Sequence, residues 1–140
     1  SFAKAARAAA DCAVYGADTD AAVLSAAVAS GAVDGPLDGA ALASVDLLVL
    51  ASPVYYGSFS AQLHAAIHRT YALDKPKRVS KMALILSSGA REVYVACERI
   101  YHGFIQGYFG VEDLGVLTAA GDENKSPEKI EELRAFGRSL

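Results

Sequence analysis

Two short segments carry the residues best suited to hold a ligand. Each follows an apolar run, so each is expected where a strand ends. Together they offer hydroxyls, backbone amides beside glycines and two aromatic rings, which is chemistry for holding a ligand, because surface loops rarely carry paired rings without a function. The alternative is that both tyrosines are half-buried loop aromatics without a ligand. The candidate residues are Ser52, Pro53, Val54, Tyr55, Tyr56, Gly57, Ser87, Ser88 and Gly89.

Other reactive residues do not form a recognisable metal or nucleophile site. His64 and His68 have the spacing of two metal ligands on one helix face, but Ala65 stands where the zinc-protease motif has glutamate. A zinc site needs three or four ligands, so we expect no metal. Ser87–Gly89 lacks the G-x-S-x-G context of an activated serine. No P-loop or glycine-rich dinucleotide fingerprint follows a strand, and we assign no catalytic side chain.

Alternating strands and helices would position the two segments. Apolar runs predict buried parallel strands at 45–51, 82–86 and 113–119. Pro53 fixes its own φ, so we expect the chain to leave the sheet at Ser52-Pro53. The residues Ser58–Ser60 are then expected to open a helix.

Two further helices are predicted in the second half of the chain. The first covers 92–109 and ends at Gly110, and its apolar stripe holds Val93, Cys97, Ile100, Phe104 and Tyr108. The second begins at Ser126-Pro127-Glu128, an N-cap followed by a first-turn proline and an acid. Strands alternating with helices of this length predict a doubly wound parallel sheet in three layers, α/β/α.

The segment SPVYYGSFSAQL, which follows a buried strand, resembles the flavodoxin-like NAD(P)H-dependent FMN reductase family, in its iron–sulfur-flavoprotein-like branch but without the cysteine motif. The resemblance continues through 82–90 and, less sharply, from Tyr108 to Ser126, about two thirds of the chain. It implies a flavodoxin-like fold that binds FMN and uses NADPH or NADH as co-substrate. In that family the Ser52–Gly57 loop would line the flavin ring, and the Ser87–Ala90 loop would meet it from the neighbouring strand.

The N-terminal third departs from this pattern. It predicts an alanine-rich helix at Ser1–Ala10, a short strand at Cys12–Ala17, and a helix at Asp20–Ser30 that Asp20 caps and Gly31 ends. The resemblance requires a first strand and a loop that wraps the FMN phosphate, and both are missing from the sequence. A truncated chain, a divergent member or a sequence from which disordered residues are dropped would each explain this, and we favour the last.

Length and composition limit the remaining possibilities. With 140 residues and a net charge of −3, the chain is expected to form a single domain, 1–140, with no nucleic-acid or membrane-surface role. No apolar run has membrane-spanning length. Cys12 and Cys97 show no metal or redox spacing, and Cys97 is expected to be a buried thiol. We expect a cytoplasmic protein.

The function that these features imply is an FMN-dependent oxidoreductase. The resemblance implies that electrons pass from NAD(P)H through bound FMN to a small acceptor, such as a flavin or quinone, with no side-chain acid or base required. Two alternatives remain open: a flavodoxin-type electron carrier without its own substrate turnover, and a flavin-free structural domain of the same fold. A ring seated in a shallow crevice is often completed by a second subunit, so we expect a homodimer or homotetramer.

Overall fold

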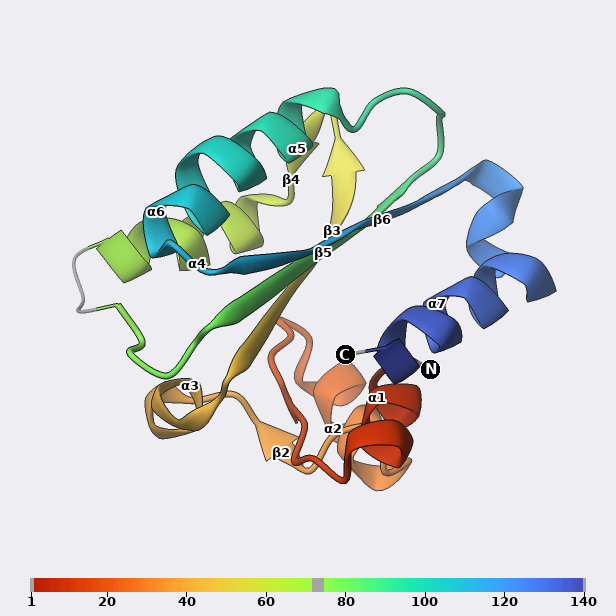
Figure 1. Ribbon diagram of the computed structural model, residues 1–140. Helices are drawn as coiled ribbons and strands as arrows, with labels where there is room; N and C mark the ends of the chain where they lie inside the picture. Colours follow the sequence, from red (N-terminus) through yellow and green to blue (C-terminus); the bar gives the residue numbers. More distant parts are fainter. Residues whose placement is uncertain (1, 72–74, 140) are drawn as a thin grey trace. The chain divides into compact units, whose positions relative to one another are not determined.

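The computed structural model describes residues 2–71 and 75–139 (Figure 1). Its contacts divide the chain into two compact units, one formed by 1–42 with 125–140 and the other by 43–124. We describe each unit by itself, and the prediction of a single domain stays a prediction. No helix in the described part of the chain is both long and apolar enough to cross a membrane.

The unit 43–124 is built on a four-stranded sheet in the order β4-β3-β5-β6. The strands β3 (Leu47–Tyr55), β5 (Lys81–Ser88) and β6 (Glu112–Ala120) run parallel, and β4 (Ser58–Phe59) pairs antiparallel with the end of β3. The three predicted strands are therefore present, each extended at its carboxyl end. The flavodoxin-like α/β class is confirmed. Strand β6 contains a bulge, in which Gly115 has a φ of +106°.

Helices α4 (Ala61–Tyr71) and α5 (Val95–Ile100), the π-helix η1 (Tyr101–Gln106) and α6 (Gly107–Phe109) lie against one face of this sheet (Figure 1). The core between the helices and the sheet is contiguous and apolar, as expected for helices that cover a parallel sheet. It consists of Leu50, Val54, Phe59, Val79, Met82, Leu84, Leu86, Tyr94, Cys97, Tyr101, Ile105 and Ala120.

The expectation that the chain leaves the sheet at Ser52-Pro53 is wrong. Strand β3 continues to Tyr55, and Pro53 lies opposite Ser87 of β5. Proline is compatible with an extended backbone where its missing N–H does not belong to the ladder, so it does not end this strand. Helix α4 consequently starts at Ala61, not within Ser58–Ser60, because Ser58 and Phe59 form β4.

The predicted stripe on the helix over 92–109 is correct only in its first half. Cys97 is buried, and Val93 and Ile100 pack against the core, but Phe104 is 73% exposed and Tyr108 is 42% exposed. The π-helix widens the turn, so the buried positions recur every four residues, at Cys97, Tyr101 and Ile105. A stripe calculated for 3.6 residues per turn therefore places Phe104 and Tyr108 on the wrong face.

The unit formed by 1–42 and 125–140 pairs α1 with α7 and contains a two-stranded parallel sheet of β1 and β2. Asp20 caps α2 by accepting from the Ala22 N–H at 2.8 Å, and Gly31 follows with a φ of +67°, both as predicted. The predicted strand over 12–17 is shorter than expected. The elements are α1 (Phe2–Ala10), β1 (Tyr15–Gly16), α2 (Ala21–Ala29), β2 (Gly35–Pro36) and α7 (Pro127–Ser139).

Two shorter helices include the sequence positions at which the chain passes from one unit to the other. Helix α3 (Gly39–Ser44) and the 3-10 helix η2 (Gly121–Lys125) were not predicted. Ser126 caps α7 as predicted, because its hydroxyl accepts from the Lys129 N–H at 3.1 Å.

Candidate functional site

The carboxyl ends of β3 and β5 bring the two predicted segments side by side. Ser52 lies opposite Leu86, and Pro53 lies opposite Ser87, in a parallel register that runs the length of both strands. In open parallel sheets, ligands bind beyond this edge. The structure thus gathers the candidate residues in one place, and their contact with a ligand stays a prediction.

A tight hairpin between β3 and β4 presents the two tyrosine rings to solvent. Tyr55 pairs with Ser58, and the turn residues between them, Tyr56 and Gly57, have φ values of +51° and +72°. Two left-handed residues make a type I′ turn, in which a tyrosine costs about 1 kcal/mol relative to glycine. Tyr55 is 63% exposed and Tyr56 is 109% exposed, so neither ring is a half-buried loop aromatic.

Ser52 and Val54 support this loop from within. Ser52 is buried, and its hydroxyl accepts from the Ser60 N–H at 2.9 Å and donates to the Pro53 carbonyl oxygen at 2.7 Å. Both functions of the hydroxyl are therefore engaged inside the protein. The Val54 side chain belongs to the core. These two residues fix the loop, which leaves Tyr55, Tyr56 and Gly57 as the part of it that reaches outward.

The second loop is held by hydrogen bonds to its own backbone and to η2. The Ser88 hydroxyl accepts from the Ala90 N–H at 3.0 Å, and the Asn124 amide donates to the Ser88 carbonyl oxygen at 3.0 Å. Gly89 is exposed, and a Cβ placed on it would meet no atom within 4 Å. Ser87 is half-buried, and its hydroxyl has no hydrogen-bond partner among the described residues. A ligand at this edge would find room beside Gly89 and an available hydroxyl.

Asn124 was not among the candidates that the sequence singled out. It donates both to Ser88 and to the Gly121 carbonyl oxygen, at 3.0 and 2.9 Å, and so ties the loop after β6 to the loop after β5. Arg91 and Glu123 form an ion pair between the same two loops. The position of Asn124 after the third strand was the available signal, because all three parallel strands end at the same edge.

These residues fit the ring portion of a flavin. Exposed aromatic rings, free space over glycine and short polar groups are what a planar, partly polar ring system requires of its site. The two loops carry one cationic side chain, Arg91, which is paired with Glu123. The arrangement therefore supports ring binding more directly than binding of a phosphate.

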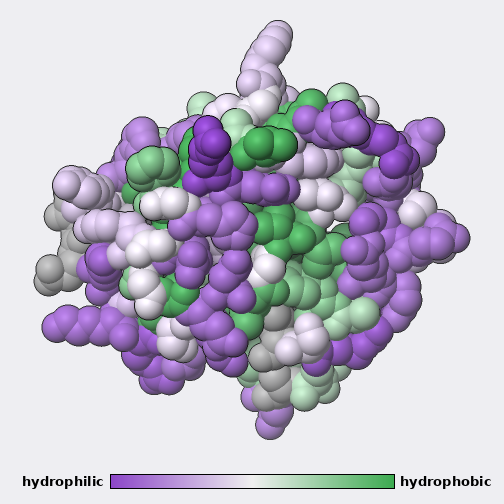
Figure 2. All heavy atoms as spheres, turned by 45° about the horizontal axis from the view of Figure 1, so that its top comes forward, coloured by the Kyte–Doolittle hydropathy of each residue, from purple (hydrophilic) through white to green (hydrophobic). Residues whose placement is uncertain are grey.

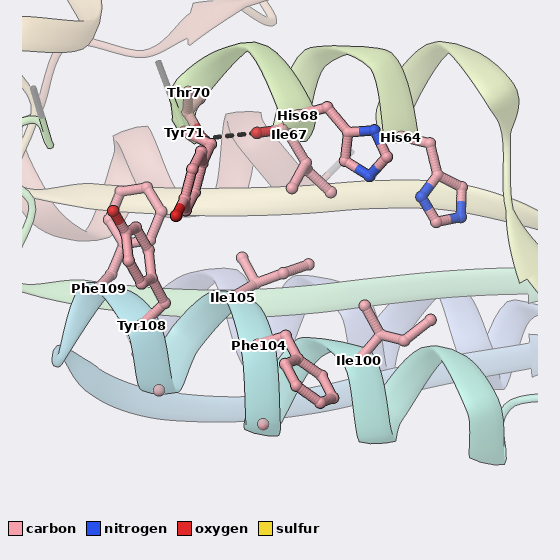
Figure 3. A pocket seen from close by; sticks show the side chains of 12 residues that line it. His64, Ile67, His68, Thr70, Tyr71, Ile100, Phe104, Ile105, Tyr108 and Phe109 are labelled. Carbon is pink, nitrogen blue, oxygen red and sulfur yellow. Dashed lines mark hydrogen bonds between the residues drawn. The ribbon is translucent and has the colours of Figure 1, made fainter. Parts of the chain in front are cut away.

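An apolar groove of about 860 Å³ lies between α4 and the segment formed by α5, η1 and α6. Figure 3 shows the α4 side chains on one side of it and those of the π-helix segment on the other. Hydrophobic side chains also reach the surface between hydrophilic ones in the space-filling view (Figure 2). The sequence did not predict this groove. Its lining comprises His64, Ile67, His68, Thr70, Tyr71, Ile100, Gly103, Phe104, Ile105, Gly107, Tyr108 and Phe109.

His64, on helix α4, lies next to the strand-end hairpin. Its Nε2 lies 2.8 Å from the Ser58 hydroxyl, at the end of the ring-loop hairpin. His68 lies one turn further along α4, with the two imidazole centroids 5.8 Å apart. Within the described residues, no group of three His, Cys, Asp or Glu side chains is placed to hold a metal ion.

Cys97 is fully buried beneath the hairpin. Its Sγ lies 3.6 Å from the Gly57 carbonyl oxygen, within reach of a weak hydrogen bond, and burial followed by the charge of Glu98 raises the pKa of the thiol. The thiol is therefore held protonated, which confirms the buried cysteine that the sequence predicts. Cys97 supports the turn from the protein interior and does not face the strand-end surface.

The parallel sheet and the paired strand-end loops define a flavodoxin-like α/β protein. Residues 38–102 match the model of the NADPH-dependent FMN reductase family, and this segment includes both candidate loops in full. The matched segment covers a little less than half of the chain, and over these residues the chain is similar to the NADPH-dependent FMN reductases. No curated protein matches the chain closely enough to add a named relative.

Proposed function

We propose that the protein is an FMN-dependent oxidoreductase that passes electrons from NADPH or NADH through bound FMN to a small acceptor, such as a free flavin or a quinone. The observation that carries the proposal is the family match over 38–102, which spans two loops that lie side by side at the carboxyl ends of β3 and β5. Fold alone would not suffice, because this sheet hosts many unrelated functions.

The roles of the residues follow from their exposure and their partners. The rings of Tyr55 and Tyr56 would contact the flavin, and the backbone N–H of Gly57 and Gly89 with the Ser87 hydroxyl would donate to its polar edge. Ser52, Pro53, Val54 and Ser88 would hold the two loops in place. Bound FMN would supply the hydride chemistry, so the protein needs no general acid or base.

The start of α4 adds a favourable electrostatic contribution. The helix begins at Ala61, and the Ser60 hydroxyl accepts from the Leu63 N–H at 3.3 Å as an N-cap. The partial positive charge of this helix terminus lies beside the hairpin and would favour negative charge on a reduced ring. The N-cap Ser60 is the last residue of the segment Ser58–Ser60 that the sequence predicts to open this helix.

Two measurements on the purified full-length protein test the proposal. We expect the protein to bind FMN, seen as quenching of flavin fluorescence, and to oxidise NADPH or NADH at steady state when an acceptor such as a quinone is supplied. Binding without turnover would indicate a flavodoxin-type electron carrier. The absence of binding would indicate a flavin-free structural domain and would overturn the proposal.

We also propose that the protein acts as a homodimer or homotetramer in the cytoplasm. The exposed rings of Tyr55 and Tyr56 support an assembly in which a second subunit completes the site. Two free cysteines, one of them exposed, support a reducing compartment. Light scattering coupled to size-exclusion chromatography tests the assembly, and a monomer at micromolar concentration would contradict it.

A further inference from the structure

The hydrogen bond between His64 and Ser58 links helix α4 directly to the hairpin that carries the candidate ring loop. The His64 Nε2 lies 2.8 Å from the Ser58 hydroxyl, and its ring lies edge-on to Phe59, with centroids 5.5 Å apart. Ser58 is the pairing partner of Tyr55, and Phe59 is that of Val54. The imidazole therefore contacts both residues of β4.

The hairpin is short and needs such support. Strand β4 has only two residues, and the turn before it places Tyr56 at a φ of +51°, a conformation that a tyrosine adopts only under constraint. The ring of Tyr56 buries no surface that would compensate for this strain, because it is fully exposed. Contacts from outside the turn must therefore stabilise it.

Within the described residues, four contacts hold the hairpin besides the strand pairing. Phe59 is buried in the core, and the Ser60 N–H donates to the hydroxyl of Ser52 at 2.9 Å. On the turn itself, the Gly57 carbonyl oxygen accepts the weak hydrogen bond of Cys97. The His64–Ser58 bond is the contact that joins the turn's exit to the first turns of α4, where the imidazole also lines the groove.

We propose that His64 is a positioning residue for the flavin site. By binding Ser58, it holds the Tyr56–Gly57 turn in the conformation that receives the ring, and it takes no part in proton transfer. This inference rests on the proposed FMN site, and it assigns to His64 a role that its neighbour on the same helix face, His68, does not share.

The experiment compares His64→Ala and Ser58→Ala with His68→Ala as the matched control. We expect the first two to raise the FMN dissociation constant about three- to tenfold, the effect of losing one hydrogen bond, while turnover at saturating FMN stays near that of the parent. The double variant should be no worse than either single variant, because both remove the same bond. His64→Gln, whose amide both donates and accepts, should restore much of the affinity.

Amide hydrogen exchange of the apo-protein separates positioning from general stability and does not depend on FMN. In His64→Ala, exchange should rise in residues 55–60 and stay unchanged in β5 and β6. If the parent protein binds no FMN, the proposed function fails, whereas the exchange data still decide whether His64 holds the hairpin. Equal exchange and equal affinity in His64→Ala and His68→Ala, or a uniform rise in exchange across the protein, would overturn the inference.

Discussion

The ring-loop hairpin, residues 55–59, and the helical segment 95–109 both carry aromatic side chains into solvent, but they do so by different means. In the hairpin, a left-handed turn exposes Tyr55 and Tyr56. In the helical segment, a π-helix turns Phe104 outward while it buries Tyr101 completely. The first departure from regular geometry lies at the strand-end edge, and the second lies within the helical layer.

The two departures are also stabilised differently. Side chains from neighbouring elements hold the hairpin, namely Ser52 and His64. The π-helix is held mainly by the burial of its own residue Tyr101, whose hydroxyl also donates to Asp113 of β6 at 3.0 Å. Changes in the helical segment should therefore alter stability, whereas changes in the hairpin should alter ligand affinity.

The largest effect on stability is expected from replacing Tyr101 of the π-helix with alanine, with Phe104→Ala as the comparison. Tyr101→Ala removes a fully buried ring and should lower the free energy of unfolding by about 3–5 kcal/mol. Phe104→Ala, in the same helix, should change it by less than about 0.5 kcal/mol because the ring is 73% exposed. Urea denaturation measures both. A larger loss for Phe104→Ala than for Tyr101→Ala would mean that the helix keeps the regular phase that the sequence indicates.

Two glycines of the same segment provide the next test, with opposite expected signs. A Cβ on Gly107 would lie 2.7 Å from the His102 carbonyl oxygen, so Gly107→Ala must distort the π turn and should cost about 1–3 kcal/mol. A Cβ on Gly103 meets nothing within 4 Å, so Gly103→Ala should stabilise the protein by up to about 1 kcal/mol. Thermal unfolding of the two variants decides the matter. A stabilising Gly107→Ala would exclude the π geometry.

Substitutions in the hairpin are expected to change the affinity for FMN and not the stability of the fold. Replacing Tyr55 and Tyr56 with alanine should weaken FMN binding by about 1 kcal/mol for each lost ring contact, with little change in the melting temperature, because both rings are exposed. Tyr71→Ala, which removes another ring that is 77% exposed, serves as the control and should leave affinity unchanged. Fluorescence quenching of FMN by the apo-proteins gives the values. Unchanged affinity in the double variant would remove this loop from the site.

The same contrast explains how much the sequence could predict. Each strand-end segment directly follows a strand, so its position depends on that strand. The apolar runs and the order of the strands therefore sufficed to predict that Ser52–Gly57 lies beside Ser87–Gly89. The prediction that Pro53 ends the strand was wrong because a proline interrupts a strand only where its missing N–H would have donated to a neighbouring strand, which local sequence does not reveal. Periodicity failed at Phe104 because one inserted π turn shifts every later position, and the sequence bears no mark of it beyond Gly103 and Gly107.

His64 shows a second limit. Its spacing to His68 suggests a shared helix face, which the groove confirms, yet the functional difference between the two arises from a contact with Ser58 that depends on β4. Strand β4 has two residues and no alternating pattern, so local sequence does not predict it. Tertiary contacts of this kind, like the Asn124–Ser88 bond, become visible only when the strand ends are placed.

The smallest effect is expected from the histidines when FMN is saturating. Hydride transfer between a nicotinamide and a flavin needs no general base, so alanine at His64, His68 or His102 should leave turnover within about tenfold of the parent. For His64 the loss should appear in FMN affinity, because its contact is with Ser58, whereas His102 pairs with Asp113 at 3.1 Å near the start of β6.

The measurement is NADPH oxidation at saturating FMN, with bound flavin quantified in each variant. Loss of a true acid–base catalyst typically costs about 10²–10⁴-fold. A thousandfold fall in one variant that still binds FMN would therefore identify a proton-transfer residue. It would contradict the mechanism in which the protein only binds and positions the flavin.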